Sequence, residues 1–210
     1  KKKELVGNFK NPGTRWHKKG EAEIVNIYDF VNLSKGKAIP YGVYELLKNN
    51  GFVNVGMSHD TAEFAVESIR KWWKHIGKKN YRAATKLLIC ADGGGSNASR
   101  SRLWKYHLQK LADETKLEIV VCHYPPGTSK WNKIEHKMFS FISMNWRGKP
   151  LTSYEMIINL IENTTTKKGL KISAKIDTTI YKTKEKISKE EFEQVNLHRH
   201  KTNPQWNYTI

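Results

Sequence analysis

The spacing of apolar residues predicts strands in the first quarter of the chain. The stretch "ELVGNF" (residues 4–9) reads as a short strand, and residues 38–58 hold two β-rich runs on either side of "NNG". Apolar, β-prone runs that flank such a turn sequence are typical of a β-hairpin. The chain therefore begins with a meander of three strands.

Apolar residues recur at helical spacing in three later segments. The first predicted helix has Asp60 as its N-cap, Glu63 as the partner in a capping box, and Gly77 as its end. A second helix is predicted over roughly residues 99–115, and a third carries the apolar residues between 134 and 142. Each helix has an apolar stripe that favours packing against a sheet.

Two continuous apolar runs, "KLLICAD" (86–92) and "LEIVVCHY" (117–124), separate these helices and predict strands of the buried type. The meander followed by αβαβα implies a mixed sheet with helices on both faces. Residues 151–165 read as a further helix, and residues 167–189 are rich in lysine. We expect a core over residues 1–150 and a helical, basic C-terminal extension over residues 151–210 that packs on it.

The charge balance points to nucleic acid as the partner. Lys and Arg total 37 against 20 Asp and Glu, a formal net charge of +17, and the pI is about 9.8. Such a basic domain has the electrostatic footprint of a nucleic-acid binder. The alternatives are a merely soluble basic protein and one that meets an anionic membrane. No basic amphipathic helix with an aromatic face stands out, so nucleic acid ranks above membrane. No apolar run reaches the length of a membrane span, and nothing resembles a signal peptide.

The two cysteines, Cys90 and Cys122, each end a short apolar run. This position predicts small buried residues in a reducing cytoplasm rather than a disulfide or a metal pair. The chain has no CxxC motif and its histidines are scattered, so the spacing argues against a structural zinc site.

Two acids follow the two buried strands. Asp92 comes directly after the first of them and before three glycines, and Glu135 lies in the first turn of the helix after the second. A right-handed crossover brings parallel strands together with the same ends up, so both carboxylates are expected at one edge of the sheet. Convergent carboxylates surrounded by bases suit Mg²⁺ and phosphate chemistry.

Each acid also has a purely structural explanation. Asp before glycine is common in turns, and the helix dipole favours Glu in a first turn. Asp29 in "IYDF" is a candidate third acid, although a turn at a strand end explains it as well. The glycine run "GGGSN" lacks the lysine of a P-loop, which makes nucleotide binding a weak reading.

The segments "ICADGGGSN" and "HYPPGTSKWNKIEHKMF" resemble DDE-type insertion-sequence transposases of the ISAzo group, and "SKWNKIEH" is more distantly similar to mariner-type transposases. Further stretches support the resemblance over nearly the whole chain: "KKKELVGNFKN", "GKAIPYGVY", "DTAEFAVESIRKWW", "TTTKKGLK" and "PQWNYTI". The resemblance implies a ribonuclease-H-like fold. It also implies a triad of acids that binds two Mg²⁺ ions, for which Mn²⁺ can substitute.

Carried over residue by residue, the resemblance makes Asp92 the second catalytic acid and Glu135 the third, both as metal ligands. The first acid would belong to an Asp-Thr just before Lys1, so we expect little or no catalysis from residues 1–210 alone. The bases and amide beside the third acid are expected to contact DNA: Lys130, Asn132, Lys133 and His136. Lys133 departs from the related motif, which often has Pro there.

The implied reaction is hydrolysis at the transposon end, which frees a 3′-OH, and then attack of that 3′-OH on target DNA. The implied partner is double-stranded DNA, both terminal repeats and target, with a homodimer on DNA and a nucleoid-associated location in the cytoplasm. Two alternatives stay open. One is a catalytically incomplete or domesticated module that only binds DNA, and the other is a nuclease of the same fold.

Overall fold

The computed structural model describes residues 3–210, so Lys1 and Lys2, the start of the segment "KKKELVGNFKN", lie outside the described residues. The chain forms two compact units, each built from two stretches of sequence. The first unit contains the described residues up to Ser58 together with Lys133–Ile180, and the second contains His59–Asn132 and Tyr181–Ile210. Each unit is described by itself below.

A four-stranded mixed sheet forms the centre of the first unit. Its order is β1 (Glu4–Val6), β2 (Gly36–Glu45), β3 (Asn50–Gly56) and β6 (Lys171–Asp177). The first three strands are antiparallel neighbours, whereas β6 runs parallel to β3. The predicted hairpin is therefore confirmed, with Asn49 in the left-handed region at φ 53° where the chain turns.

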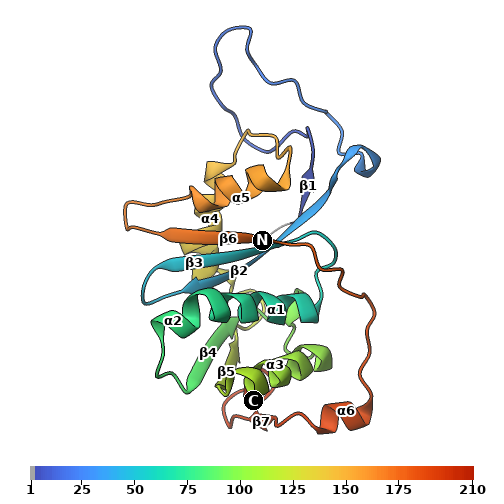
Figure 1. The fold of residues 1–210 in the computed structure, drawn as a ribbon, viewed down its shortest axis with the longest axis vertical. Helices are drawn as coiled ribbons and strands as arrows, with labels where there is room; N and C mark the ends of the chain where they lie inside the picture. Colours follow the sequence, from blue (N-terminus) through green and yellow to red (C-terminus); the bar gives the residue numbers. More distant parts are fainter. Residues whose placement is uncertain (1–2) are drawn as a thin grey trace. The chain divides into compact units, whose positions relative to one another are not determined.

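Three helical segments pack their apolar faces on this sheet: η5 (Glu135–Phe139), α4 (Ser140–Asn145) and α5 (Tyr154–Glu162). Figure 1 labels α4 and α5 beside the strands of this unit. η5 is a π-helix that continues directly into α4. The core between helices and sheet contains Val53, Val55, Met138, Phe139, Ile142, Trp146, Ile157, Ile161, Ile172 and Ala174. A 3-10 turn, η1 (Val31–Leu33), interrupts the long loop before β2.

The second unit has its own four-stranded mixed sheet. The order is β4 (Lys86–Ala91), β5 (Glu118–His123), β8 (Asn207–Thr209) and β7 (His198–Arg199). β4 and β5 are parallel, as the crossover predicts, and β8 is antiparallel to both of its neighbours. The predicted mixed α/β class is confirmed, and its strands are divided between two sheets.

The helices of the second unit follow the predicted order. α1 (Ala62–Trp72) continues through the π-helix η2 (Trp73–Gly77) into α2 (Lys78–Asn80), and it packs against α3 (Arg102–Thr115) (Figure 1). Short turns η3 (Gly95–Asn97) and η4 (Ser129–Trp131) follow the two parallel strands, and α6 (Lys189–Glu193) precedes β7. The N-cap of α1 is Thr61, whose side chain accepts from Phe64 N, and not the predicted Asp60.

Burial of β4 differs from the prediction. Its residues alternate between exposed and half-buried, and Leu88 is 61% exposed. Within residues 3–210, β4 pairs with β5 only, and its exposed residues Lys86, Leu88 and Cys90 share one face of the strand, so that face is open to solvent. For the same reason the predicted burial of Cys90 is wrong, since its side chain is exposed. Cys122 on β5 is partly buried, and both thiols are free.

The C-terminal third contributes strands to both sheets, in addition to helices, through β6, β7 and β8. None of these three strands is among the predicted elements. The compact units do not test the predicted division into domains at residue 150, which stays a prediction. Over residues 3–210, no helix combines the length and the apolar character that crossing a membrane requires.

Candidate active site

Asp92 lies immediately after β4 in the second unit, at the carboxyl end of the strand, and its side chain is exposed. Asn97 holds it in place. The Asn97 amide Nδ2 donates to Asp92 Oδ1 at 2.8 Å and to the Asp92 backbone oxygen at 3.0 Å. Because Asn97 is itself only 9% exposed, this double contact fixes the backbone and the carboxylate together. The carboxylate is thus oriented before any ligand arrives.

A series of buried, hydrogen-bonded side chains also supports the backbone of Asp92. His123 at the end of β5 places Nδ1 at 3.0 Å from the Asp92 carbonyl oxygen and Nε2 at 3.0 Å from the Tyr208 hydroxyl. Trp104 Nε1 donates to the same hydroxyl at 2.8 Å. A carbonyl can only accept, so Nδ1 carries the proton and Nε2 accepts from Tyr208. The side-chain polar atoms of Trp104, Tyr208 and His123 then all have hydrogen-bond partners.

The protonation states agree with this arrangement. Burial lowers the pKa of His123, which keeps the imidazole neutral at pH 7. Burial also raises the pKa of Tyr208, so its hydroxyl keeps the proton that it donates. Strand β8 therefore supports the position of Asp92 indirectly, through the contact of Tyr208 with His123.

The glycines after Asp92 leave space beside its carboxylate. A Cβ atom added at Gly94 or Gly95 would have no atom within 4 Å, and Gly95 has a left-handed φ of 63°. An exposed carboxylate beside an open glycine loop offers hard oxygen ligands and room for water and phosphate. That donor chemistry fits Mg²⁺, which uses few protein carboxylates and keeps several waters.

Glu135 belongs to the first unit, where it is the first residue of the π-helix η5 and is partly exposed. Met138 and Phe139 of the same π-helix are buried against the β2–β3 hairpin. The close approach requires glycine: a Cβ added at Gly42 would lie 2.6 Å from Met138 Cε, and one at Gly51 would overlap Met138 Sδ. These two glycines thus allow the helix that carries Glu135 to pack closely on the hairpin. Single-turn π-helices are frequent at functional sites.

The predicted DNA contacts divide between the two units. Lys130 and Asn132 are in the second unit, and Lys133 and His136 are in the first. Lys130, Lys133 and His136 are exposed, as a phosphate contact requires, whereas Asn132 is 9% exposed. These four assignments stay predictions, as does the pairing of Asp92 with Glu135, because the two acids also belong to different units.

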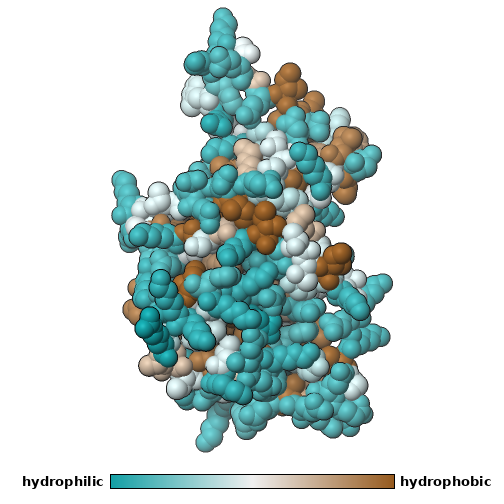
Figure 2. Space-filling model, viewed as in Figure 1, coloured by the Kyte–Doolittle hydropathy of each residue, from teal (hydrophilic) through white to brown (hydrophobic). Residues whose placement is uncertain are grey.

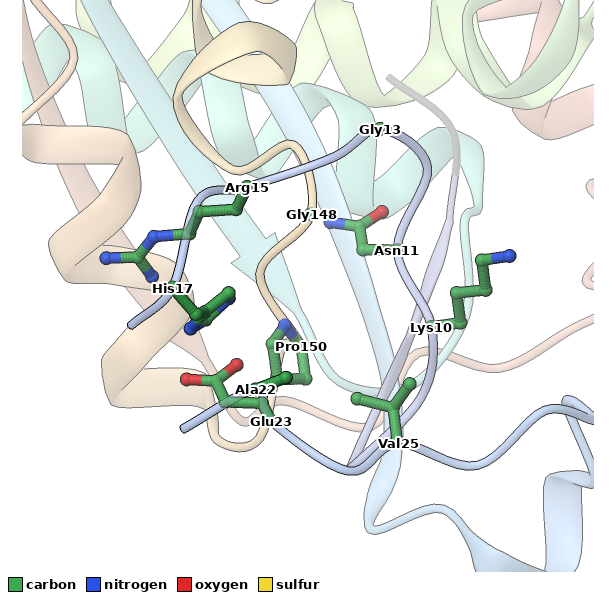
Figure 3. A pocket seen from close by; sticks show the side chains of 10 residues that line it. All are labelled: Lys10, Asn11, Gly13, Arg15, His17, Ala22, Glu23, Val25, Gly148 and Pro150. Atoms are coloured by element: carbon green, nitrogen blue, oxygen red, sulfur yellow. The ribbon is translucent and has the colours of Figure 1, made fainter. Parts of the chain in front are cut away.

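A shallow pocket of about 190 Å³ lies elsewhere in the first unit (Figure 3). It is formed by the loop of residues 10–25 and by residues 148–150, and none of the predicted site residues lines it. Lys10, Arg15 and His17 give it a basic lining, with Glu23 as the acid. The face shown in Figure 2 is mostly hydrophilic, as expected for a chain in which 27% of residues are charged.

Sequence reasoning missed the residues that hold Asp92, namely Asn97, His123 and Tyr208. Asn97 is close enough in sequence to have been considered, because Asp and Asn in a glycine-rich turn often bond to each other's backbone. Tyr208 could not be connected to Asp92 by spacing, since only the antiparallel pairing of β8 with β5 brings it there.

These features define a class of protein: a mixed α/β domain with an oriented acid at the carboxyl end of a parallel strand, consistent with a ribonuclease-H-like DDE domain. The whole chain, residues 1–210, matches the family described as the Rhodopirellula transposase DDE domain, and it belongs to that family. The predicted resemblance is thereby confirmed. No curated protein and no solved structure matches the chain. Membership makes this a transposase domain of the polynucleotidyl transferase type, which uses a divalent metal and acts on DNA.

Proposed function

We propose that this domain cuts transposon ends and joins them to target DNA with Asp92 and Glu135 as the second and third acids of a DDE triad. The observation that carries the proposal is the family match over residues 1–210. The oriented, exposed carboxylate of Asp92 beside its open glycine loop supports it. Both acids are assigned as ligands of two Mg²⁺ ions, with Mn²⁺ as a substitute. When bound, the metal supplies Lewis-acid activation of water and charge neutralisation at the phosphoryl group.

The protein's own residues do the positioning. Asn97 and His123 hold Asp92 so that its carboxylate stays at the edge of the sheet. The close packing of η5 on the hairpin fixes the start of the helix, where Glu135 lies. Hydrolysis of the phosphodiester at the transposon end frees a 3′-OH and leaves a 5′-phosphate. The 3′-OH then attacks a phosphodiester of the target strand, forms a new phosphodiester and releases a 3′-OH of the target. Displacements of this kind depend on positioning and electrostatics, with little covalent chemistry for the protein.

Basic side chains next to the acids are proposed to hold the DNA backbone. Lys130, Lys133 and His136 are exposed, and Lys130 Nζ lies 6.0 Å from the ring centre of Trp131, which is itself 53% exposed. Asn132, which is 9% exposed, is the fourth proposed DNA contact. The net charge of +17 supplies the long-range attraction for double-stranded DNA and favours association with the nucleoid. A homodimer that pairs two DNA ends is part of the same proposal.

The test is cleavage of the cognate terminal repeats in Mg²⁺. The resemblance assigns the first acid to an Asp upstream of Lys1, so the chain is extended to include it. Asp92→Asn and Glu135→Gln are each expected to abolish cleavage and joining, with DNA binding retained. Glu114→Gln, an exposed acid in an ion pair on α3, is the matched control and should cleave normally. Full activity in both acid variants would refute the assignment.

A second candidate function is DNA binding without cleavage, which the excess of 17 positive charges favours. Charge-driven binding falls steeply as salt rises, because each neutralised phosphate releases counterions. Metal-dependent cleavage by the extended chain would exclude this alternative. Cleavage of DNA without any dependence on terminal repeats would instead favour a nuclease.

A further inference from the structure

Three side chains from distant parts of the sequence meet in the second unit. One nitrogen of His107 and one carboxylate oxygen from each of Glu63 and Glu185 all lie within 4.8 Å of one another. His107 is in the middle of α3, Glu63 is in the first turn of α1, and Glu185 is in the segment that precedes α6. None of the three belongs to the proposed DDE chemistry.

His107 is the second, independent feature that points to a ligand. Its side chain is 9% exposed, and its Nε2 is buried without a hydrogen-bond partner. The Oε2 atom of Glu185 lies 3.7 Å from that nitrogen, too far for a hydrogen bond. A buried polar atom without a partner costs roughly as much as a lost hydrogen bond, so native structures rarely keep one without a purpose.

We propose that Glu63, His107 and Glu185 bind one divalent transition-metal ion of the Zn²⁺ type, which ties the segment of residues 181–188 to helices α1 and α3. Zn–N and Zn–O bonds of about 2.0–2.2 Å at tetrahedral angles hold ligand atoms about 3.3–3.6 Å apart. The separation of 3.7 Å between Nε2 and Oε2 is close to that value.

The donor set selects the class of metal. An imidazole nitrogen with two carboxylates suits Zn²⁺ and its first-row neighbours, whereas Mg²⁺ prefers oxygen ligands and retained water. A metal binds the neutral form of the imidazole, through a ring nitrogen such as the buried Nε2 of His107. Two carboxylates offset the charge of the ion, and Lys110 on the same helix is the opposing positive charge. Water would take the fourth position.

The segment that carries Glu185 shows what the ion would do. Tyr181 anchors its beginning, with 3% of the side chain exposed and an edge-to-face contact with Phe64 at 5.4 Å between ring centres. The Ser188 capping box and a contact of 5.3 Å between the Arg102 guanidinium carbon and the Phe192 ring hold its end at α6. Between these points the segment has no helix or strand (Figure 1). A metal ligand at Glu185 would fix its middle.

The test measures metal binding in the 210-residue protein carrying Asp92→Asn and Glu135→Gln, so that the proposed DDE carboxylates contribute nothing. After removal of metals with a chelator, ZnCl₂ is titrated by calorimetry and CoCl₂ by visible absorption. We expect one equivalent of Zn²⁺ to bind, a tetrahedral Co²⁺ spectrum, and no comparable binding of MgCl₂. Absence of stoichiometric Zn²⁺ binding, or equal binding of Mg²⁺, would overturn the proposal.

Single substitutions locate the site. Glu185→Gln changes an exposed side chain, so the fold should survive, and Zn²⁺ binding should weaken roughly 10-fold or more, because loss of even an outer-shell partner costs 10–100-fold. Glu63→Gln should have the same effect. Glu193→Gln is the matched control, because it removes an exposed carboxylate that pairs with Lys189 at i,i+4. Zn²⁺ affinity unchanged by Glu185→Gln and Glu63→Gln would refute the assignment.

Proteolysis reads out the structural role separately from affinity. Trypsin sites at Lys182, Lys184 and Lys186 flank Glu185 in the segment. Zn²⁺ should slow their cleavage in the parent protein and leave the rate unchanged in the Glu185→Gln protein. Equal cleavage with and without Zn²⁺ in the parent protein would show that no such tether exists.

Discussion

The Tyr208 hydroxyl is the point at which the C-terminal strand supports Asp92, so its removal is the sharpest test of that series of buried, hydrogen-bonded side chains. Tyr208→Phe deletes one oxygen that accepts from Trp104 Nε1 and donates to His123 Nε2. Trp104 and Tyr208 are fully buried and His123 is 5% exposed, so water does not replace the lost partner easily. The substitution leaves the ring in place and removes only the hydrogen bonds.

The expected cost follows from two buried groups that lose their partner. Each unsatisfied buried group costs about 1–3 kcal/mol. Relaxation of the imidazole into the vacated space reduces the sum, which gives about 2–4 kcal/mol for Tyr208→Phe. Urea unfolding of the 210-residue protein measures the total, and hydrogen exchange at the β5 and β8 amides assigns the loss to the second unit.

A double-mutant cycle with Trp104→Phe separates the pair energy from the general effects of each substitution. Because the Trp104 donor and the Tyr208 acceptor are partners, the second substitution should cost about 0.5–3 kcal/mol less in the background of the first. Tyr106→Phe, on a partly exposed ring of α3, is the control and should stay within about 0.5 kcal/mol of the parent. A Tyr208→Phe protein as stable as that control would refute the reasoning.

Three further predictions test the packing and electrostatics of both units. Burial lowers the pKa of Lys105 from 10.5 to about 8 in the folded protein. Between these pH values the unfolded chain binds more protons, so the free energy of unfolding rises with pH. Urea unfolding at pH 8 and 10.5 measures this rise, and Lys105→Met should reduce it by up to about 3 kcal/mol. Gly51→Ala should cost about 1–3 kcal/mol by calorimetry because the new methyl overlaps Met138, whereas Gly94→Ala adds a methyl in open space and should cost less. Ser188→Ala removes the capping box of α6 and should weaken the helix by about 1 kcal/mol, read as faster amide exchange at its first turn.

Local pattern was sufficient for much of the fold. The two runs around "NNG" predict the hairpin because β-prone residues and a turn signal agree, and the helix over 99–115 is observed at Arg102–Thr115 because its apolar face has a clear period. Strand β6 was not predicted, because the many lysines of residues 167–189 made the segment look like a basic extension. Its buried Ile172 and Ala174 alternate with exposed Lys171 and Ser173, a period of two that marks a half-buried strand.

The candidate site was less accessible to pattern. Asp92 at the end of a strand follows from the apolar run before it, but its supports depend on tertiary pairing. The short strand that carries Tyr208 has three residues, too few to show a period. The group of His107, Glu63 and Glu185 was not predicted either. Metal-ligand motifs are recognised by short spacing, and these three residues come from three separate segments.

The parallel pairing of β3 with β6 and the pairing of β5 with β8 have a consequence for biosynthesis. Val53 pairs with Ala174, and Val121 pairs with Tyr208, in each case a residue synthesised much later. Neither sheet can therefore be completed while the ribosome is still making the middle of the chain. Non-local pairings of this kind slow folding and prolong the exposure of unpaired edges. Nascent chains stalled before β6 should therefore depend on chaperones, and the sheet of the second unit should form only after β8 has been synthesised.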